Sequence, residues 1–84
     1  MYISRVELDQ ARRSTMIALA APKRLHGAVE RSFAGERKRR LWRLDYLGGK
    51  LYLLIFSEDR PDLTALARQF GGNMPEIREY DSLL

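Results

Sequence analysis

The chain has 84 residues, of which 45% are hydrophobic and 31% charged, with a formal net charge of +4, one histidine and no cysteine. A chain of this length forms a single domain over residues 1–84 with a modest core, because so small a domain buries only about 60% of the surface that its unfolded chain exposes. The lack of cysteine excludes disulfides and thiolate metal sites, and one histidine excludes a histidine-pair zinc site, so we expect no structural metal.

The sequence also bears on location and partners. It contains no run of roughly 18 apolar residues that could span a membrane, and its start, MYISRVELDQ, lacks the features of a signal peptide, so we expect a cytoplasmic protein without a membrane partner. Residues 23–43 hold eight Lys or Arg against two Glu, a local excess of +6. This block favours a polyanionic partner, although an acidic protein, an anionic membrane or a merely solvated loop would also account for it.

The first part of the chain predicts one strand and two helices. Residues 2–8 alternate between apolar and polar side chains, which indicates a strand. Asp9 can cap the next segment, residues 10–21, which has a helical composition but poor periodicity, so we expect a short or irregular helix. Pro22 suits the first turn of a separate helix over residues 22–33 and discourages one continuous helix.

The helix over residues 22–33 is amphipathic. At about 100° per residue its apolar arc contains Leu25, Ala28, Val29, Ser32 and Phe33. The opposite arc contains Lys23, Arg24, Gly27 and Arg31. His26 lies just beyond Phe33, at the boundary between the two arcs.

A hairpin follows the basic connection. Residues 41–47 alternate as a strand, Gly48 and Gly49 provide a two-residue turn, and residues 50–56 form an almost wholly apolar strand that we expect at the centre of the sheet. Three aromatic residues of this hairpin, Trp42, Tyr46 and Tyr52, have two possible roles. We expect them to fill the core; the alternative is that they stack RNA bases.

The last part of the chain predicts a helix and a strand. Within residues 57–72, Asp59 or Asp62 can cap a helix that Gly71 ends. Residues 76–80 can form a last short strand, and DSLL trails off after it. The order strand, helix, strand, strand, helix, strand predicts an α+β fold of the ferredoxin-like (βαββαβ) type, an antiparallel sheet with helices on one face.

His26 is the side chain best suited to proton transfer, since an imidazole can both take and give a proton near neutral pH. Lys23, Arg24 and Arg31 could hold a phosphate beside it. The alternative is a structural histidine that shields Phe33 and donates a hydrogen bond to a backbone carbonyl. On RNA, whose ribose 2′-OH is a nucleophile, such a group together with nearby cations could promote cleavage.

Two further charged groups have competing interpretations. The basic run is formed by Arg37, Lys38, Arg39 and Arg40. It could follow a phosphate backbone, or it could be a solvated loop. The acidic trio is formed by Glu58, Asp59 and Asp62. It could suggest magnesium, but it falls where helix-capping carboxylates are expected, so capping is the preferred interpretation.

Four stretches of the chain resemble a known family. MYISRVELD, RLHGAVERSF, RLWRLD and LYLLIFSEDRPDL are similar to the N-terminal half of CasE, the CRISPR-associated endoribonuclease of type I-E systems in the RAMP superfamily. The resemblance covers essentially all 84 residues in order. Its most specific part is RLHGAVERSF with its spacing from MYISRVELD.

The resemblance implies a function and a domain organisation. Members of the family have two ferredoxin-like domains, bind the stem-loop of the CRISPR repeat and cut the precursor RNA without a metal, by attack of the 2′-OH that leaves a cyclic phosphate. The processed guide RNA stays bound, and the enzyme becomes a subunit of Cascade, the antiviral surveillance complex. This chain would lack the C-terminal domain, so alone it should bind repeat RNA weakly and cleave it poorly or not at all.

The resemblance also assigns residues. The family's catalytic histidine falls on His26, and a basic residue that assists some members falls on Arg31. Lys23 stands where some members have a catalytic tyrosine, so a lysine would have to stabilise the transition state or act as an acid. Together with the basic run, Arg24 is expected to contact RNA.

Two other function classes compete with a repeat endoribonuclease. One is a non-catalytic ferredoxin-like module that binds RNA or docks to a protein, in which His26 would have no chemical role. The other is a ligand-sensing domain, which finds little support because no loop shows the signature of a small-molecule pocket. We expect no cofactor and no small-molecule ligand.

Overall fold

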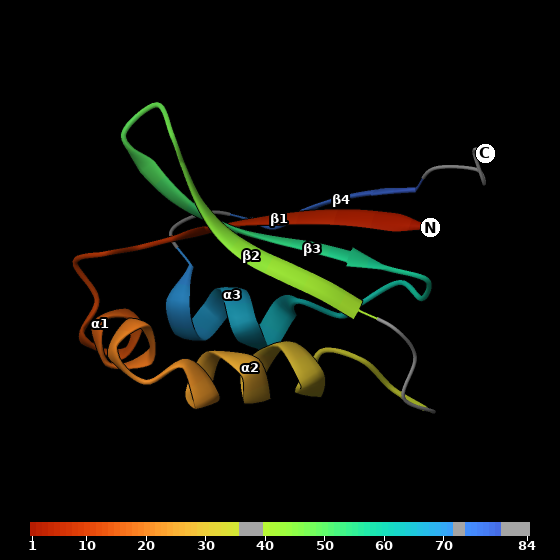
Figure 1. Cartoon of the computed structure of the whole chain (residues 1–84), viewed down its shortest axis with the longest axis horizontal. Coiled ribbons are helices and arrows are strands. Elements are labelled where there is room, and N and C mark those ends of the chain that lie inside the picture. The colour runs from red at the N-terminus through yellow and green to blue at the C-terminus, as the bar shows by residue number, and fades with distance from the viewer. Residues whose placement is uncertain (36–39, 72–73, 80–84) are drawn as a thin grey trace.

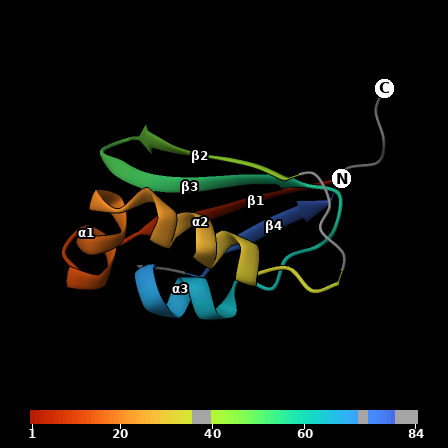
Figure 2. The same cartoon turned by 60° about the horizontal axis from the view of Figure 1, so that its bottom comes forward.

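The computed structural model describes residues 1–35, 40–71 and 74–79 (Figure 1). In these ranges the chain forms β1 (Tyr2–Leu8), α1 (Arg13–Ala20), α2 (Pro22–Arg31), β2 (Arg40–Leu47), β3 (Lys50–Ser57), α3 (Thr64–Phe70) and β4 (Glu76–Glu79). The sheet has the order β2-β3-β1-β4, its neighbouring strands are antiparallel, and the helices cover one of its faces (Figure 1 and Figure 2). This topology confirms the predicted ferredoxin-like fold.

The core lies between the sheet and the helices. Successive side chains of a strand point to opposite faces, so the register that pairs Val6 with Leu53 directs both toward the helices. The buried apolar side chains in the described ranges are Val6, Leu8, Ala18, Leu25, Ala28, Val29, Leu51, Leu53, Ile55, Leu63, Leu66 and Phe70. Three of them belong to β3, which lies between β2 and β1 as its apolar sequence predicts.

The turn of the hairpin is the predicted one. Leu47 pairs with Lys50, so Gly48 and Gly49 alone connect β2 to β3. Their φ angles of 61° and 82° lie in the left-handed region that glycine adopts without strain.

Of the three hairpin aromatic residues that we expected in the core, two lie outside it. Trp42 packs against the core, as predicted. Tyr46 lies on the same face of β2 but is 64% exposed, because the hairpin end of the sheet turns away from the helices (Figure 1). Tyr52 lies on the outer face, where the guanidinium of Arg5 is 4.8 Å from its ring centroid. The prediction of core filling is therefore wrong for Tyr46 and Tyr52.

The two helices after β1 begin in different ways. Asp9 does not cap α1 as predicted, because its Oδ1 accepts a hydrogen bond from the Ala11 amide at 2.9 Å and closes a turn before the helix. Arg12 precedes α1 without a side-chain cap. Pro22 occupies the first turn of α2, as predicted, and α2 ends at Arg31.

None of the helices in the described ranges is long and apolar enough to cross a membrane.

The ends of α3 have identifiable causes. The Thr64 amide donates a hydrogen bond to Oδ1 of Asp62 at 3.1 Å, so Asp62 supports the first turn. Hydrogen bonds from Thr64 hold the pKa of the Asp62 carboxyl below its usual range. Gly71 ends the helix, as predicted, but its φ of −86° is ordinary. Glycine is needed here because a Cβ would lie 2.7 Å from the Ala67 carbonyl oxygen.

The start of α1 is hydrogen-bonded to the carboxyl end of α3. Side-chain donors of α1 and its preceding residue bind backbone carbonyl oxygens of α3. The bonds join Arg12 to Arg68, Ser14 to Gln69 (2.6 Å) and Thr15 to Phe70 (3.0 Å). Because the last carbonyl groups of a helix have no partner inside it, these donors supply the missing partners and fix α1 against α3.

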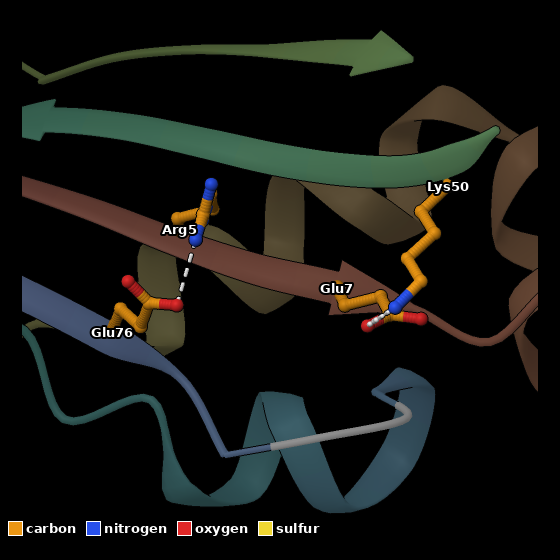
Figure 3. Close-up of polar contacts among 4 residues, drawn as sticks. All are labelled: Arg5, Glu7, Lys50 and Glu76. Atoms are coloured by element: carbon orange, nitrogen blue, oxygen red, sulfur yellow. Dashed lines mark hydrogen bonds and ion pairs between the residues drawn. The ribbon is translucent and has the colours of Figure 1, made fainter. Parts of the chain in front are cut away.

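The outer face of the sheet carries ion pairs between strands (Figure 3). Nη2 of Arg5 lies 2.7 Å from Oε1 of Glu76 and joins β1 to β4. Nζ of Lys50 lies 3.9 Å from Oε1 of Glu7 and joins β3 to β1. The hydrogen bond from Arg5, together with its charge, holds the pKa of Glu76 below its usual range, and the same bond raises the pKa of Arg5.

Two glycine substitutions should have opposite effects on stability. Gly71→Ala should lower the free energy of unfolding by about 1–3 kcal/mol, because the new Cβ meets helix backbone that cannot move freely. At Gly27 a Cβ would lie 3.1 Å from Nη1 of Arg31, the end of a flexible side chain. Gly27→Ala should therefore raise the free energy of unfolding by up to about 1 kcal/mol, the helix-propensity gain. Urea denaturation measures both, and equal effects would contradict the explanation.

Glu76→Gln should change how stability depends on pH. A carboxyl whose pKa is lowered by folding stabilises the fold above its unfolded-state pKa, near 4.3, and loses this contribution as the pH falls through its folded-state pKa. We expect the Tm of Glu76→Gln to be below that of the parent at neutral pH. The gap should narrow as the pH is lowered from about 6 to about 2. Circular dichroism melts test this with Glu58→Gln as the control; a gap that stays constant with pH would contradict it.

Candidate functional site

His26 lies exposed on the side of α2 that faces β2. The centroids of its ring and the Trp42 ring are 6.4 Å apart, and the rings are inclined by 67°, an edge contact typical of aromatic pairs. Trp42 packs against the core, so the imidazole has a fixed neighbour. His26 has no hydrogen-bond partner among the residues that the structure describes, so the expected alternative of a bond to a backbone carbonyl is not observed there. Within the described residues, neither ring nitrogen is engaged in a hydrogen bond.

The sequence suggests that Arg40 is exposed and contacts a phosphate, but its side chain is buried. Its guanidinium is 4.1 Å from the centroid of the Phe33 ring, and its Nη1 lies 2.9 Å from Oε1 of Glu30. The side chain is only 5% exposed. Because its charge is balanced within the fold and little of it is accessible to a phosphate, we reassign Arg40 to linking the end of α2 to the start of β2.

The cationic side chains of α2 line a cavity. The cavity has a volume of about 290 Å³ and lies among the three helices. Residues that line it include Lys23, Arg24 and Arg31 from α2, Ser14 from α1, and Gln69 and Phe70 from α3. The side chain of Arg31 folds back along α2 over Gly27, whose lack of a Cβ leaves room for the guanidinium. We call this the three-helix cavity.

His26 does not line the three-helix cavity. Each residue of an α-helix advances by about 100°, so Arg31 lies about 140° around α2 from His26, whereas Lys23 lies only about 60° from it. The structure therefore places His26 and Arg31 on different flanks of α2, with Lys23 between them.

Comparison with known proteins identifies the family. The model of a family described as CRISPR associated protein matches residues 1–84. The chain belongs to this family. A solved structure of the CRISPR endoribonuclease Cse3 bound to a 19-nucleotide RNA has the same fold, with a TM-score of 0.74 and 24% sequence identity. The match covers 90% of this chain and 39% of the Cse3 chain, so this protein spans well under half of that enzyme's length. No curated protein matches.

The family match confirms the predicted relationship to CRISPR-associated proteins, and the fold shared with Cse3 agrees with the predicted ferredoxin-like domain. Three site residues predicted for this CRISPR-associated protein, Arg37, Lys38 and Arg39, lie outside the described residues. Sequence reasoning missed Ser14 and Gln69, which line the three-helix cavity together with the predicted cations. No sequence pattern marked them, because they come from separate helices that meet only in the folded chain.

The acidic trio of this CRISPR-associated protein lies before α3. Asp62 supports the helix start, and the backbone carbonyl of Asp59 accepts a hydrogen bond from Oγ of Ser57 at 2.7 Å. In the described ranges no three His, Asp or Glu side chains form a group that could hold a metal ion. The position of Asp62 at the start of α3 agrees with helix capping, the preferred interpretation of these carboxylates.

Arg40→Gln should destabilise the protein more than a matched change nearby. It removes an ion-pair partner of the partly buried Glu30, so we expect the free energy of unfolding to fall by about 2 kcal/mol. Arg43 is 67% exposed and its Nη2 lies 3.5 Å from Oδ2 of Asp45, so Arg43→Gln should change stability by less than about 0.5 kcal/mol. Urea denaturation compares the two. Similar small losses would show that Arg40 has no structural role.

Proposed function

We propose that this chain is the RNA-binding and histidine-bearing domain of a CRISPR repeat endoribonuclease. The observation that carries the proposal is His26 of α2, an exposed imidazole in edge contact with Trp42, with no hydrogen-bond partner among the described residues and with cations on the same helix. The family match and the shared fold with an RNA-bound endoribonuclease support it. The RNA partner we propose is the stem-loop of the CRISPR repeat.

The proposed reaction is transesterification within the RNA. The 2′-oxygen forms a bond to the adjacent phosphorus while the bond from phosphorus to the 5′-oxygen breaks, which leaves a 2′,3′-cyclic phosphate and a 5′-hydroxyl. The 2′-OH loses a proton and the leaving 5′-oxygen gains one, so the reaction balances without a water molecule. His26 acts as the general acid or base for one of these transfers, and Lys23, on the same side of α2, faces the negative charge that develops on the phosphate.

The whole protein requires more than these residues. Since the chain spans 39% of Cse3, we propose that it works with a second ferredoxin-like domain that completes the RNA-binding surface. In the cell we place the complete enzyme in the cytoplasm, with the processed guide RNA retained and other Cascade subunits as partners. The isolated domain should then bind the repeat weakly and cleave it slowly.

The test replaces the matched segment of Cse3 with this chain and measures cleavage of a stem-loop repeat RNA. His26→Ala in this chimera should lower the single-turnover rate at saturating RNA by about 10²–10⁴-fold, the usual contribution of a positioned proton-transfer group. Cleavage should persist in EDTA and yield a 2′,3′-cyclic phosphate end. Arg43→Gln, on the outer face of β2, is the matched control and should cleave like the parent.

The same assay separates the enzyme from a non-catalytic module. A binding module predicts that His26→Ala has no effect on cleavage by the chimera. That result, with RNA binding retained, would overturn the assignment of His26 and leave the domain as an RNA-binding or protein-docking module.

A further inference from the structure

β2 is a long edge strand with a hydrophobic surface. The sheet order places it at one end, so β3 is its only neighbour among the strands that the structure describes (Figure 2). Large hydrophobic side chains of β2 are exposed on both faces of the sheet: Leu41, Leu44, Tyr46 and Leu47. Edge strands of this kind readily pair with another strand, because the backbone N–H and C=O groups along their open side lack partners.

The hairpin turn determines which backbone groups of β2 point to the open edge. The φ angles of Gly48 and Gly49 are those of a type I′ turn, in which Leu47 and Lys50 form a hydrogen-bonded pair. Hydrogen-bonded and non-hydrogen-bonded pairs alternate along antiparallel strands. Alternate residues from Leu47 backward therefore direct their N–H and C=O groups toward β3. The residues between them direct theirs to the open edge: Trp42, Leu44 and Tyr46.

Charge selects one register for a second β2 strand. Only residues that point to the open edge can form hydrogen-bonded pairs with it, so a symmetric antiparallel pair is centred on a residue and not between two residues. Centring on Arg43 or on Asp45 places like charges directly opposite each other, which is unfavourable. Centring on Leu44 instead places Arg43 opposite Asp45 of the second copy. Within one chain Nη2 of Arg43 already lies 3.5 Å from Oδ2 of Asp45, so the pairing makes a group of four alternating charges.

The same register pairs the exposed hydrophobic side chains. On the outer face of the sheet, Leu41 lies opposite Leu47 of the second copy. On the face toward the helices, Leu44 lies opposite Leu44 of the second copy, and Trp42 lies opposite its Tyr46, an aromatic pair. Each exposed hydrophobic side chain of β2 thus meets another hydrophobic side chain, and the strand is complementary to itself.

We propose that the open edge of β2 binds a second copy of this chain, with the two β2 strands antiparallel and centred on Leu44. The pairing makes one continuous sheet with four strands from each copy, and the helices of both copies lie on the same face of it. Because one strand from each copy forms the contact, we expect a weak association, with a Kd of about 100 μM. Cleavage and denaturation assays at much lower protein concentrations therefore observe the single chain.

The first experiment measures the mass of the chain in solution by sedimentation equilibrium. Between about 10 μM and about 1 mM, the mass should rise from that of one chain toward that of two. Arg43→Glu and Asp45→Arg should each weaken the association at least about tenfold, because each places like charges opposite each other. Combining both substitutions exchanges the charges and should restore the parent's Kd to within about threefold.

The control for net charge is Arg13→Glu at the start of α1, which changes the charge as much as Arg43→Glu does but lies away from β2. It should associate like the parent. A chain that stays monomeric at about 1 mM would overturn the proposal. A double variant as weak as the single variants would overturn it as well, because the charges would then not lie opposite each other.

The second experiment tests the register by disulfide formation. The chain has no cysteine, so Leu41→Cys and Leu47→Cys each introduce a single thiol. In the proposed dimer these two positions form a non-hydrogen-bonded pair with Cα atoms about 4.5 Å apart, within the range of a disulfide. Two copies of the same position lie about 20 Å apart, six residues along the strand. Under mild oxidation, a mixture of the two variants should therefore give at least about fivefold more linked dimer than either variant alone. Equal yields in the three samples would overturn the proposal.

The alternative occupant of this edge is the second domain of a longer enzyme. Hydrogen exchange in the Cse3 chimera described above distinguishes the two occupants. If copies pair, the amides of Trp42, Leu44 and Tyr46 should exchange at least about twofold more slowly at about 500 μM than at about 1 μM protein. Exchange that is independent of concentration would overturn the proposal, and slow exchange at both concentrations would assign the edge to the second domain. None of these measurements depends on cleavage, so this proposal and the proposed function are tested separately.

Discussion

The carboxyl end of α3 is stable in this fold because α1 supplies hydrogen-bond donors to it. A buried carbonyl without a partner costs about 1–3 kcal/mol, and Thr15 forms its bond to Phe70 in a buried position. The amide of Asp9 donates to the same Phe70 oxygen at 2.8 Å, so the turn before α1 takes part as well. These bonds place α1 beside α3, and with it the wall of the cavity that α2 completes. The arrangement of the candidate site therefore depends on a contact between polar groups as much as on the apolar core.

Three parts of the α2 surface make different contacts. Leu25, Ala28 and Val29 are buried against the core, which fixes the helix in position and rotation. The flank toward β2 presents His26 to Trp42, and the ion pair between Arg40 and Glu30 fastens the end of that flank. The remaining flank carries the cations of the three-helix cavity. A helix of ten residues can separate these tasks because side chains two or five positions apart face different directions.

Much of the fold could be predicted because its determinants are local. Gly48 and Gly49 specify a two-residue turn, the spacing in α3 specifies its apolar face, and Pro22 marks the start of α2. The poor periodicity of α1 also has an explanation: Thr15, a polar residue, occupies a buried position in order to reach Phe70. The apolar pattern is interrupted where a hydrogen bond replaces an apolar contact.

The errors concern contacts between segments that are distant in the sequence. Alternation shows that Tyr46 shares a face with Trp42, but not that the helices stop short of it. Arg40 belongs to a basic run in the sequence, and only its position at the start of β2 brings it onto Phe33. For the site, His26 and its neighbouring cations could be named from the sequence. Their distribution over two flanks, and the part played by Ser14 and Gln69, depend on how the helices pack.

The pairing of β1 with β4 brings the first and the last described strand residues together, although they are far apart in the sequence. Tyr2 lies opposite Glu79 in the sheet, and its hydroxyl donates to Oε2 of Glu79 at 3.3 Å, so the two outermost described strand residues are neighbours. The turn at Gly48 and Gly49 lies at the other end of β3, because Leu51 pairs with Leu8 while Ser57 pairs with Tyr2. A circular permutant that joins the β1 and β4 ends and opens at this turn would keep every strand pairing and leave α1, α2 and α3 uninterrupted. The geometry around His26 is thus a property of how the layers pack, independent of where along the fold the polypeptide starts.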